Sequence, residues 1–197
     1  VDPIRQDLDI SDTQVSLLQG LAFANFYSVM GLPIARLADR SNRRNIITAG
    51  IFLWCAMTAA CGLARSYLQL FIARIGVGVG EAALSPPAYS IIADYFPPHR
   101  RARATRTYSL GVYLGSGIAM LVGGASIEAI SRLGVIDLPL LGEFQPWQLT
   151  FLVVGLPGLL VGALMFTIKE PQREASGTQE TVTSGAVSWR GLLEFFI

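Results

Sequence analysis

The chain has 197 residues, of which 52% are hydrophobic and only 15% are charged, and its mean hydropathy is +0.48. Because a soluble domain usually carries about a quarter charged residues, this composition argues against a soluble fold and favours a protein embedded in lipid. The formal net charge of +1 indicates no partner by itself. Both cysteines, Cys55 and Cys61, lie in one apolar stretch. They are interpreted as packing residues, since their spacing fits neither a metal site nor a disulfide framework.

Five stretches of the sequence are long and apolar enough to cross a bilayer, which takes about 20 residues. They are predicted at residues 13–35, 45–64, 66–93, 107–127 and 146–168. Backbone groups in hydrocarbon must form their hydrogen bonds within the segment, so these spans are expected to be helices. Ser11 and Gln14 have the pattern of a capping box that opens the first span. The sequence therefore predicts an all-α membrane protein.

The connections between the spans differ in charge, and this difference predicts the orientation. One side carries most of the Lys and Arg residues: Arg36, Arg40, Arg43, Arg44, Arg100, Arg101, Arg103, Arg106, Lys169, Arg173 and Arg190. The other side carries only Arg5, Arg65 and Arg132. Since positive charge accumulates on the inner side, the first side is expected to be cytoplasmic. The first span then enters from outside, and we expect one further helix upstream of Val1.

The chain is predicted to divide into a transmembrane bundle, residues 1–168, and a cytoplasmic segment, residues 169–197. Residues 174–188 are rich in Ser, Thr, Gln and Gly, which is typical of a flexible linker. Residues 189–197 turn apolar again. They are interpreted as an interfacial helix, as the approach to a further span, or as a disordered end.

The third predicted span contains two charged residues, Arg74 and Glu81. Charges within a span are costly and usually mark a functional site. They lie two helical turns apart, so both are expected on one face, about 10 Å apart along the axis. Glu81 falls near the middle of the span, where a carboxyl group can take up and release a proton as its surroundings change. The alternative is a static charge pair that ties helices together.

Small residues surround this pair and recur in the fourth span. Glycines alternate in the run 76–80, which predicts close approach of neighbouring helices. No strand precedes the run and no Lys-Ser or Lys-Thr follows it, so a phosphate loop is disfavoured. Pro86 and Pro87 remove two backbone donors and are expected to bend or loosen the helix. Gly111 and Gly115 form a small-xxx-small pair, which predicts packing against a partner helix.

The connection between the first two spans is the most specific motif in the sequence. Its simplest interpretation is a basic anchor at the inner surface. It also resembles the signature Gly-x-Leu-x-Asp-Arg-x-Gly-Arg-Arg of the major facilitator superfamily, with matches at Leu37, Asp39, Arg40, Arg43 and Arg44. Ala35 and Asn42 replace the two glycines of that signature.

Further motifs are similar to those of spinster-like transporters within that superfamily. They are the Asp-Arg-x-Asn-Arg variant of the connection, Arg74-x-x-x-Gly78-x-Gly80-Glu81-Ala82, Ser85-Pro86, Ile91–Phe96, the arginines after Asp94, and Gly115–Gly117. The resemblance covers most of residues 7–173. It implies the major facilitator N-terminal helical bundle with helices two to six present, the first helix and the C-terminal half being outside this chain.

The resemblance also implies roles for individual residues. Glu81 would be the protonation site and Arg74 its regulating partner; the family often adds an acidic residue on helix one, which this chain does not contain. A cytoplasmic gate that holds the two transporter halves together while the outer side is open would be formed by Asp39, Arg40, Arg43, Arg44 and Asp94.

Candidates for the lining of a substrate cavity are Asn25, Tyr27, Ser85 and Tyr113. Hydrogen bonding between helices, or a place at the membrane interface, is an equally good interpretation for each of them.

Taken with the resemblance, these features predict a proton-coupled secondary active transporter that works by alternating access of two bundles. The resemblance favours an amphiphilic lipid substrate, such as a lysophospholipid or a sphingoid lipid. A drug or organic-anion carrier of the same superfamily is the second hypothesis, and a structural membrane subunit is a third. A membrane enzyme is disfavoured, because the only histidine, His99, lies in a basic connection and no metal-ligand spacing occurs.

The expected partners are the lipid bilayer, a small amphiphilic substrate, protons and the C-terminal transporter half. No cofactor, metal or nucleic acid is expected. The expected location is the cell membrane, with the bacterial inner membrane as the favoured case.

Overall fold

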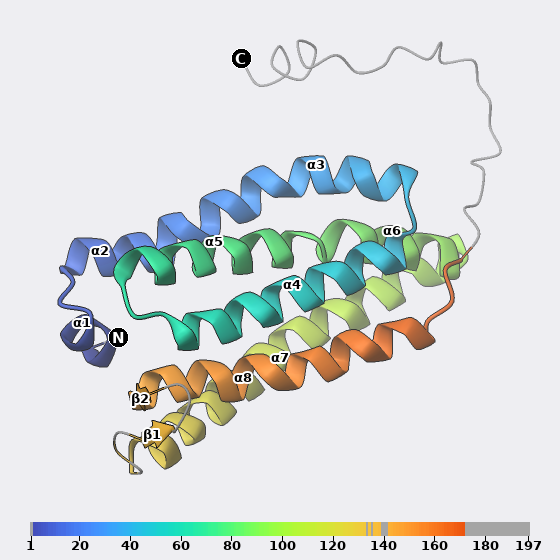
Figure 1. The fold of residues 1–197 in the computed structure, drawn as a ribbon. Helices are drawn as coiled ribbons and strands as arrows, with labels where there is room; N and C mark the ends of the chain where they lie inside the picture. Colours follow the sequence, from blue (N-terminus) through green and yellow to red (C-terminus); the bar gives the residue numbers. More distant parts are fainter. Residues whose placement is uncertain (1, 133, 135, 139–141, 172–197) are drawn as a thin grey trace, which may run out of the picture.

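The computed structural model describes residues 2–132, 134, 136–138 and 142–171. Within them, five helical segments are long and apolar enough to cross a membrane: Asp12–Arg40, Arg43–Leu63, Tyr67–Tyr95, Pro98–Ser131 and Pro146–Thr167. The segments run side by side along one long axis (Figure 1). The prediction of an all-α membrane protein with five spans is confirmed. Beyond Pro171, the predicted linker and the apolar residues 189–197 lie outside the described residues.

The first span joins three helical elements, α2 (Asp12–Ser16), the π-helix η1 (Leu17–Asn25) and α3 (Phe26–Arg40). The second is α4 (Arg43–Leu63), and the third joins α5 (Tyr67–Ala82) to α6 (Ser85–Tyr95). The fourth is α7 (Pro98–Ser131), and the fifth joins α8 (Pro146–Leu164) to the short 3-10 helix η2 (Met165–Thr167). A short helix, α1 (Asp2–Asp7), precedes the first span.

The helices are longer than several of the predicted spans. The largest difference is in α7, which covers Pro98–Ser131 where 107–127 was predicted. Counting uncharged residues finds the part of a helix that lies in hydrocarbon. The helix itself continues into the charged interfacial region, where arginine side chains reach water.

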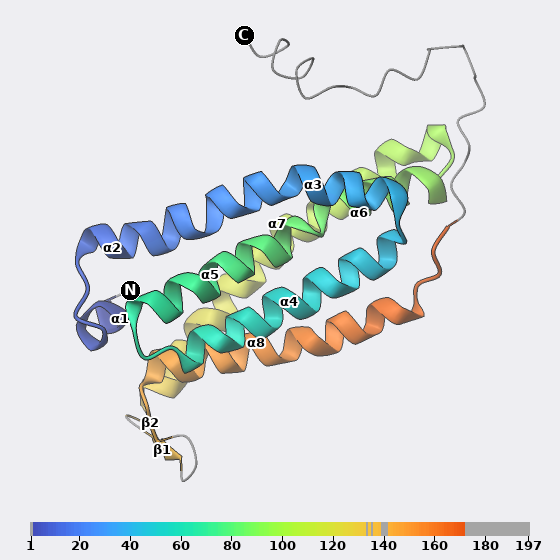
Figure 2. The same cartoon turned by 45° about the horizontal axis from the view of Figure 1, so that its top comes forward.

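The helix α4 is the centre of the packing. It lies between α5 and α8, with η1 and α3 on the other side of α5, while α7 passes behind these helices and contacts α8 and α6 (Figures 1 and 2). Glycines permit these contacts: a Cβ atom on Gly80 would lie 2.7 Å from the backbone nitrogen of Trp54, and one on Gly155 would lie 2.9 Å from that of Ala59. The close approach predicted for the glycines of α5 is confirmed.

Three local features can be compared with the sequence. The capping box of Ser11 and Gln14 is present at the start of α2. The third span is interrupted between Ala82 and Ser85, so the predicted effect of Pro86 and Pro87, which occupy the first turn of α6, is confirmed. An antiparallel hairpin, β1 (Ile136–Leu138) with β2 (Gly142–Phe144), pairs Ile136 with Phe144 and was not predicted.

The glycines of α7 differ from those of α5. A Cβ atom on Gly111 or Gly115 would have no atom within 4 Å. The described part of the chain therefore supplies no partner helix at this small-residue pair, and its packing stays a prediction.

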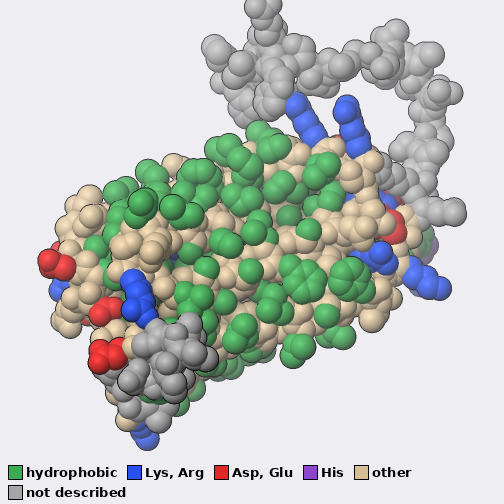
Figure 3. Space-filling model, viewed as in Figure 1, with side chains coloured by type: hydrophobic (Ala, Val, Ile, Leu, Met, Phe, Trp, Pro, Cys, Tyr) green, Lys and Arg blue, Asp and Glu red, His purple; other side chains and the backbone are tan. Residues whose placement is uncertain are grey.

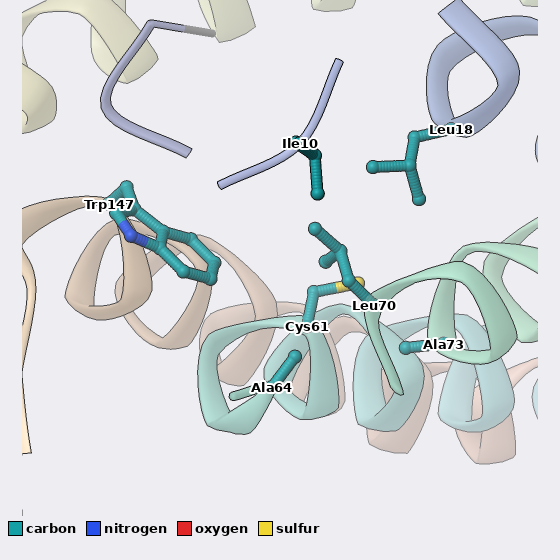
Figure 4. Close-up of a cluster of buried hydrophobic side chains, with 7 residues drawn as sticks. All are labelled: Ile10, Leu18, Cys61, Ala64, Leu70, Ala73 and Trp147. Carbon is teal, nitrogen blue, oxygen red and sulfur yellow. The ribbon is translucent and has the colours of Figure 1, made fainter. Parts of the chain in front are cut away.

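A hydrophobic cluster closes the end of the bundle where α4 and α5 connect, with Ile10, Leu70 and Cys61 gathered at its middle (Figure 4). Trp147, at one edge of the cluster, donates its indole N–H to the carboxylate of Asp7 at 2.9 Å. This bond ties α1 to the first turn of α8. Cys55 and Cys61 are both buried and unpaired by disulfide, as expected of packing residues.

Replacing Gly80 with Ala tests the packing of α4 on α5. The added methyl group would press on the backbone of Trp54 and Gly50, so we expect the free energy of unfolding to fall by roughly 1–3 kcal/mol. Gly31→Ala in α3 is the matched control, because open space surrounds that position and alanine favours a helix. Thermal unfolding in detergent would measure both; equal midpoints for the two variants would contradict the packing argument.

Candidate functional site

The side chain of Arg74 lies half-buried on α5, toward the outer end of the third span. Its guanidinium group lies over the ring of Phe151 on α8, 5.2 Å from the ring centre, which is a cation–π contact. Arg74 also lines a cavity of about 30 Å³ together with Gln19 and Ile4. That volume is enough for a water molecule. A charge within the membrane thus lies on an aromatic face, beside a small and mainly apolar cavity that one amide side chain borders.

Glu81 lies half-buried two turns further along α5, just before the interruption of the span. It is near enough to Arg74 for a Coulombic interaction. Among the described residues, however, the two side chains form no ion pair within contact distance. A carboxyl group that is partly buried and not locked to a cation can exchange a proton when water reaches it.

The backbone around Glu81 is shaped by the π-helix of the first span. A Cβ atom on Gly78 would lie 2.7 Å from the carbonyl oxygen of Phe23, so η1 and α5 meet backbone to backbone one turn before Glu81. Irregular π-helical turns occur often at functional sites. Here the π-helix lies against Gly78, which is between Arg74 and Glu81 on α5.

A cluster of hydroxyl groups follows Glu81 on the side of α6. Tyr108 on α7 lies near Ser85, and its ring meets that of Tyr89 edge-on at 5.2 Å. Tyr27 on α3 is close enough to interact electrostatically with Tyr108, and it stacks on Phe23. Three helices therefore bring phenol and hydroxyl groups together one turn from Glu81.

Arg43 is the centre of a second group of charges, at the end of the bundle where α3 and α4 connect. Its side chain is 2% exposed. The guanidinium group donates to Asp94, to the hydroxyl of Ser90 at 2.9 Å and to Glu170 at 2.8 Å. It also donates to the carbonyl oxygen of Pro171 at 3.2 Å. One buried cation thus joins the second, third and fifth spans.

Glu170 completes this network from the end of the fifth span. Besides the Arg43 side chain, its carboxylate accepts the backbone N–H groups of Arg43 at 3.2 Å and Arg44 at 2.9 Å. It therefore caps the positive end of the α4 dipole. Burial alone would raise the pKa of Glu170, but hydrogen bonds from the Arg43 side chain and from these two N–H groups hold it below its ordinary value.

Direct contacts are seen between some residues of the predicted gate and their neighbours. Arg43 and Asp94 are in direct contact, and Arg44 binds the carbonyl oxygen of Ile168 at 3.2 Å. Asp39 and Arg40 lie exposed in the last turn of α3, shortly before Arg43. Their place in a gate stays a prediction.

The four candidates for a substrate cavity also separate into two groups. Tyr27 and Ser85 belong to the hydroxyl cluster. Asn25 is exposed at the end of η1, and Tyr113 is 77% exposed on α7. The structure therefore does not bring Asn25 or Tyr113 to the cluster, and a cavity role for them stays a prediction.

Sequence reasoning missed Glu170, Ser90 and Tyr89. Glu170 was counted with the linker, and nothing in its local sequence indicates that it returns to the start of α4. For Ser90 a signal existed, because it lies one turn before Asp94 on the same helix.

Charge separates the two ends of the molecule. Lys and Arg side chains gather at the end where α3 and α4 connect, on the right of Figure 3, and a band of hydrophobic side chains covers the middle. Among the residues that the structure describes, no three His, Cys, Asp or Glu side chains gather closely enough to hold a metal ion.

Comparison with known proteins gives matches along nearly the whole chain. The family model described as Major Facilitator Superfamily matches residues 1–196. An "MFS-type efflux pump" of Mycolicibacterium smegmatis is 29% identical over 192 residues, covering 98% of this chain and 41% of that protein. The "Sphingosine-1-phosphate transporter SPNS2" of Xenopus tropicalis is 27% identical over 194 residues, covering 97% of this chain and 35% of that protein.

A solved structure is also similar to the chain. It is that of a bacterial homolog to the human lysosomal transporter Spinster, in an inward-facing and unoccupied conformation, with 38% identity and a TM-score of 0.80. The match covers 98% of this chain and 43% of that one. The chain therefore spans about two fifths of the length of these relatives.

Replacing Glu170 with Gln tests the cytoplasmic network. The change removes a partner of a buried cation, and we expect the free energy of unfolding at pH 7 to fall by roughly 1–3 kcal/mol. Because the pKa of Glu170 is lowered by folding, its contribution is complete above the unfolded value of about 4.3 and is lost as pH falls through the lower folded value.

Thermal unfolding in detergent between pH 7 and pH 3 would measure this. The difference between the parent and Glu170→Gln should shrink as the pH falls. Glu128→Gln is the control, because Glu128 pairs with Arg132 on the exposed end of α7 and that pair should contribute little. A difference that stays constant with pH would contradict the assignment.

Proposed function

Because the chain belongs to the major facilitator superfamily, we propose that it forms the N-terminal transmembrane bundle of a proton-coupled secondary active transporter of the spinster-like type. The similarity to a bacterial Spinster homolog, at 38% identity and a TM-score of 0.80, supports this assignment. Residues 1–168 form the bundle, and the residues that follow lead toward a second half. Transport then proceeds by alternating access of the two halves around a central site.

Proton coupling depends on Glu81, and its position is the observation that carries the proposal. The carboxyl group lies near mid-span, half-buried, and forms no ion pair with the residues that the structure describes. When the site faces water, the ionised form is solvated; when the site closes, desolvation favours the protonated form. A change in access therefore drives uptake and release of a proton at this side chain.

Arg74 regulates this exchange through its charge. The positive charge of Arg74 favours the ionised form of Glu81. The guanidinium group of Arg74 is itself held over the ring of Phe151 on α8. Movement of α8 relative to α5 would change the distance between the two charges. Movement of a helix would in this way change the protonation of Glu81.

The network of Arg43, Asp94 and Glu170, called the latch below, would be the part of the cytoplasmic gate that lies within this bundle. It joins three spans at one end, and breaking it would free the start of α4 from the end of the fifth span. Asp39, Arg40 and Arg44 place further charges beside this network. The second half of the transporter would dock at these charges.

The proposed substrate is an amphiphilic lipid, a lysophospholipid or a sphingoid lipid. A relative matched over 97% of the chain is named a sphingosine-1-phosphate transporter. The cluster of Tyr27, Ser85, Tyr89 and Tyr108 supports this choice, since phenol groups present both an apolar ring and a polar tip. Such groups suit a ligand with a polar head and an acyl chain.

A drug or organic-anion carrier is the second candidate function. The observation in its favour is the MFS-type efflux pump that matches 98% of the chain at 29% identity. Transport assays with a lysophospholipid and with a cationic dye distinguish the two candidates.

Replacing Glu81 with Gln in the full-length protein tests proton coupling. In proteoliposomes with an imposed pH gradient, we expect uptake by the variant to lose its dependence on the gradient, because an amide cannot carry the proton. Exchange of substrate at equal pH should persist. Glu143→Gln, in the exposed hairpin, is the control and should keep the dependence. A variant at Glu81 that responds to the gradient like the parent removes this residue from the mechanism.

A further inference from the structure

The short helix α1 and the turn after it, residues 2–10, lie at the end of the bundle where α4 and α5 connect (Figure 1). The apolar side chains of this α1 segment pack inward. Ile10 belongs to the hydrophobic cluster, and Ile4 and Leu8 pack against it. Asp9 has a left-handed backbone conformation, with φ of 47°, and turns the chain from α1 into α2. The α1 segment therefore covers the cluster.

Two polar contacts attach the α1 segment to different spans. Trp147 of α8 donates its indole N–H to Asp7 at 2.9 Å, and Arg5 donates to Asp12 of α2 at 2.7 Å. Trp147 is 8% exposed. The side chains of Arg5 and Asp12 are 41% and 85% exposed, so water screens their pair. A buried indole N–H needs an acceptor, and the contact with Trp147 is therefore the stronger attachment.

The attachment at Trp147 is connected to Arg74 through aromatic rings. The Trp147 ring meets that of Phe151 edge-on, with 6.1 Å between the ring centres and 88° between the planes. The guanidinium group of Arg74 lies over the ring of Phe151. Ile4 of the α1 segment also lines the cavity beside Arg74. The segment thus reaches the surroundings of Arg74 in two ways, through Ile4 and through the two rings.

We propose that the α1 segment is a lid over Arg74, held shut by the hydrogen bond between Asp7 and Trp147. While the bond is made, the apolar side chains of the segment keep water from the cluster and from the cavity beside Arg74. When the bond breaks, the segment moves away on the turn that follows α1, and water reaches Arg74 from this end. The lid is a conformational device at the end of the bundle opposite to the latch.

The lid acts on the arginine that the proposed function uses. Hydration of Arg74 would weaken its interaction with Glu81, because water screens charges more strongly than the interior of the bundle does. This consequence rests on the proposed function. The lid itself does not, since it concerns only access to this end of the bundle, and its test needs no transport.

Two buried cysteines of α4 can report on the lid. Cys61 is 0% exposed and Cys55 is 3% exposed. Cys61 lies in the cluster that the α1 segment covers, next to Ile10 (Figure 4). Cys55 lies in a different cluster, with Ile47 and Ile51. Opening of the lid should expose Cys61 alone, whereas general loosening of the bundle should expose both cysteines.

The rate at which a water-soluble maleimide reacts with Cys61 tests the lid. It would be measured on the full-length protein in nanodiscs, in a version whose only cysteine is Cys61. Trp147→Phe keeps a ring and removes the N–H group, and Asp7→Ala removes the acceptor. Each should speed the reaction by about tenfold, as expected for the loss of one hydrogen bond to a charged group, because the rate follows the open fraction. The double variant should be no faster than either single variant, since both remove the same bond.

Asp9→Asn is the matched control, because it removes a carboxylate from the same segment and asparagine tolerates the left-handed conformation. The Asp9 side chain is exposed and forms no hydrogen bond or ion pair with any residue that the structure describes. This variant should react at the rate of the parent; a rise equal to that of Asp7→Ala would show an effect of charge and overturn the lid.

Two further outcomes would contradict the proposal. Unchanged rates at Cys61 in Trp147→Phe and Asp7→Ala would mean that the bond does not hold the segment shut. An equal acceleration in a version whose only cysteine is Cys55 would mean that the variants loosen the whole bundle rather than open a lid.

Discussion

The burial of Arg43 is the constraint on which the end of the bundle between α3 and α4 depends. A guanidinium group that is 2% exposed needs partners for its charge and its donors, since an unpaired buried cation costs several kcal/mol. Asp94, Ser90 and Glu170 supply them from two other spans. Three helices that pack mainly through small residues and apolar contacts are thereby fixed in register at one end. The carboxylate of Glu170 also accepts the first backbone N–H groups of α4. One side chain therefore both caps this helix and pairs with the buried cation.

The two groups of charged residues in the bundle differ in how completely they are paired. Arg43 is in contact with two carboxylates, a hydroxyl group and a carbonyl oxygen. Arg74 and Glu81 interact only at a distance, and Arg74 lies on an aromatic ring instead. An incompletely paired carboxyl group in the membrane is costly, and this cost makes its protonation sensitive to water and to neighbouring helices. The bundle thus holds a closely paired charge network at the end where α3 and α4 connect, and a more widely separated pair of charges near its centre.

Sequence reasoning predicted the parts of the fold that depend on local rules. Hydrophobic length gave the five spans, the proline pair gave the interruption before α6, and the alternate glycines of α5 gave the close contact with α4. It failed where distant segments meet. Glu170 is 127 residues from Arg43, and its neighbours Lys169 and Pro171 give no sign of this contact. The T-shaped pair of Tyr89 and Tyr108 likewise needs the turn between α6 and α7 to bring the rings together. The exposed glycines of α7 show the opposite case, a packing motif whose partner is not in the described chain.

A double-mutant cycle on Arg43 and Asp94 tests the central role of the buried cation most directly. The free energy of unfolding would be measured for Arg43→Gln, Asp94→Asn and the double variant, at fixed detergent and pH. If Arg43 is held by Asp94 in a buried network, the double variant should be little worse than either single variant, with a coupling energy of about 2 kcal/mol or more. Effects that add to within about 0.5 kcal/mol would contradict the account, because they would mean that the two side chains stabilise the bundle independently.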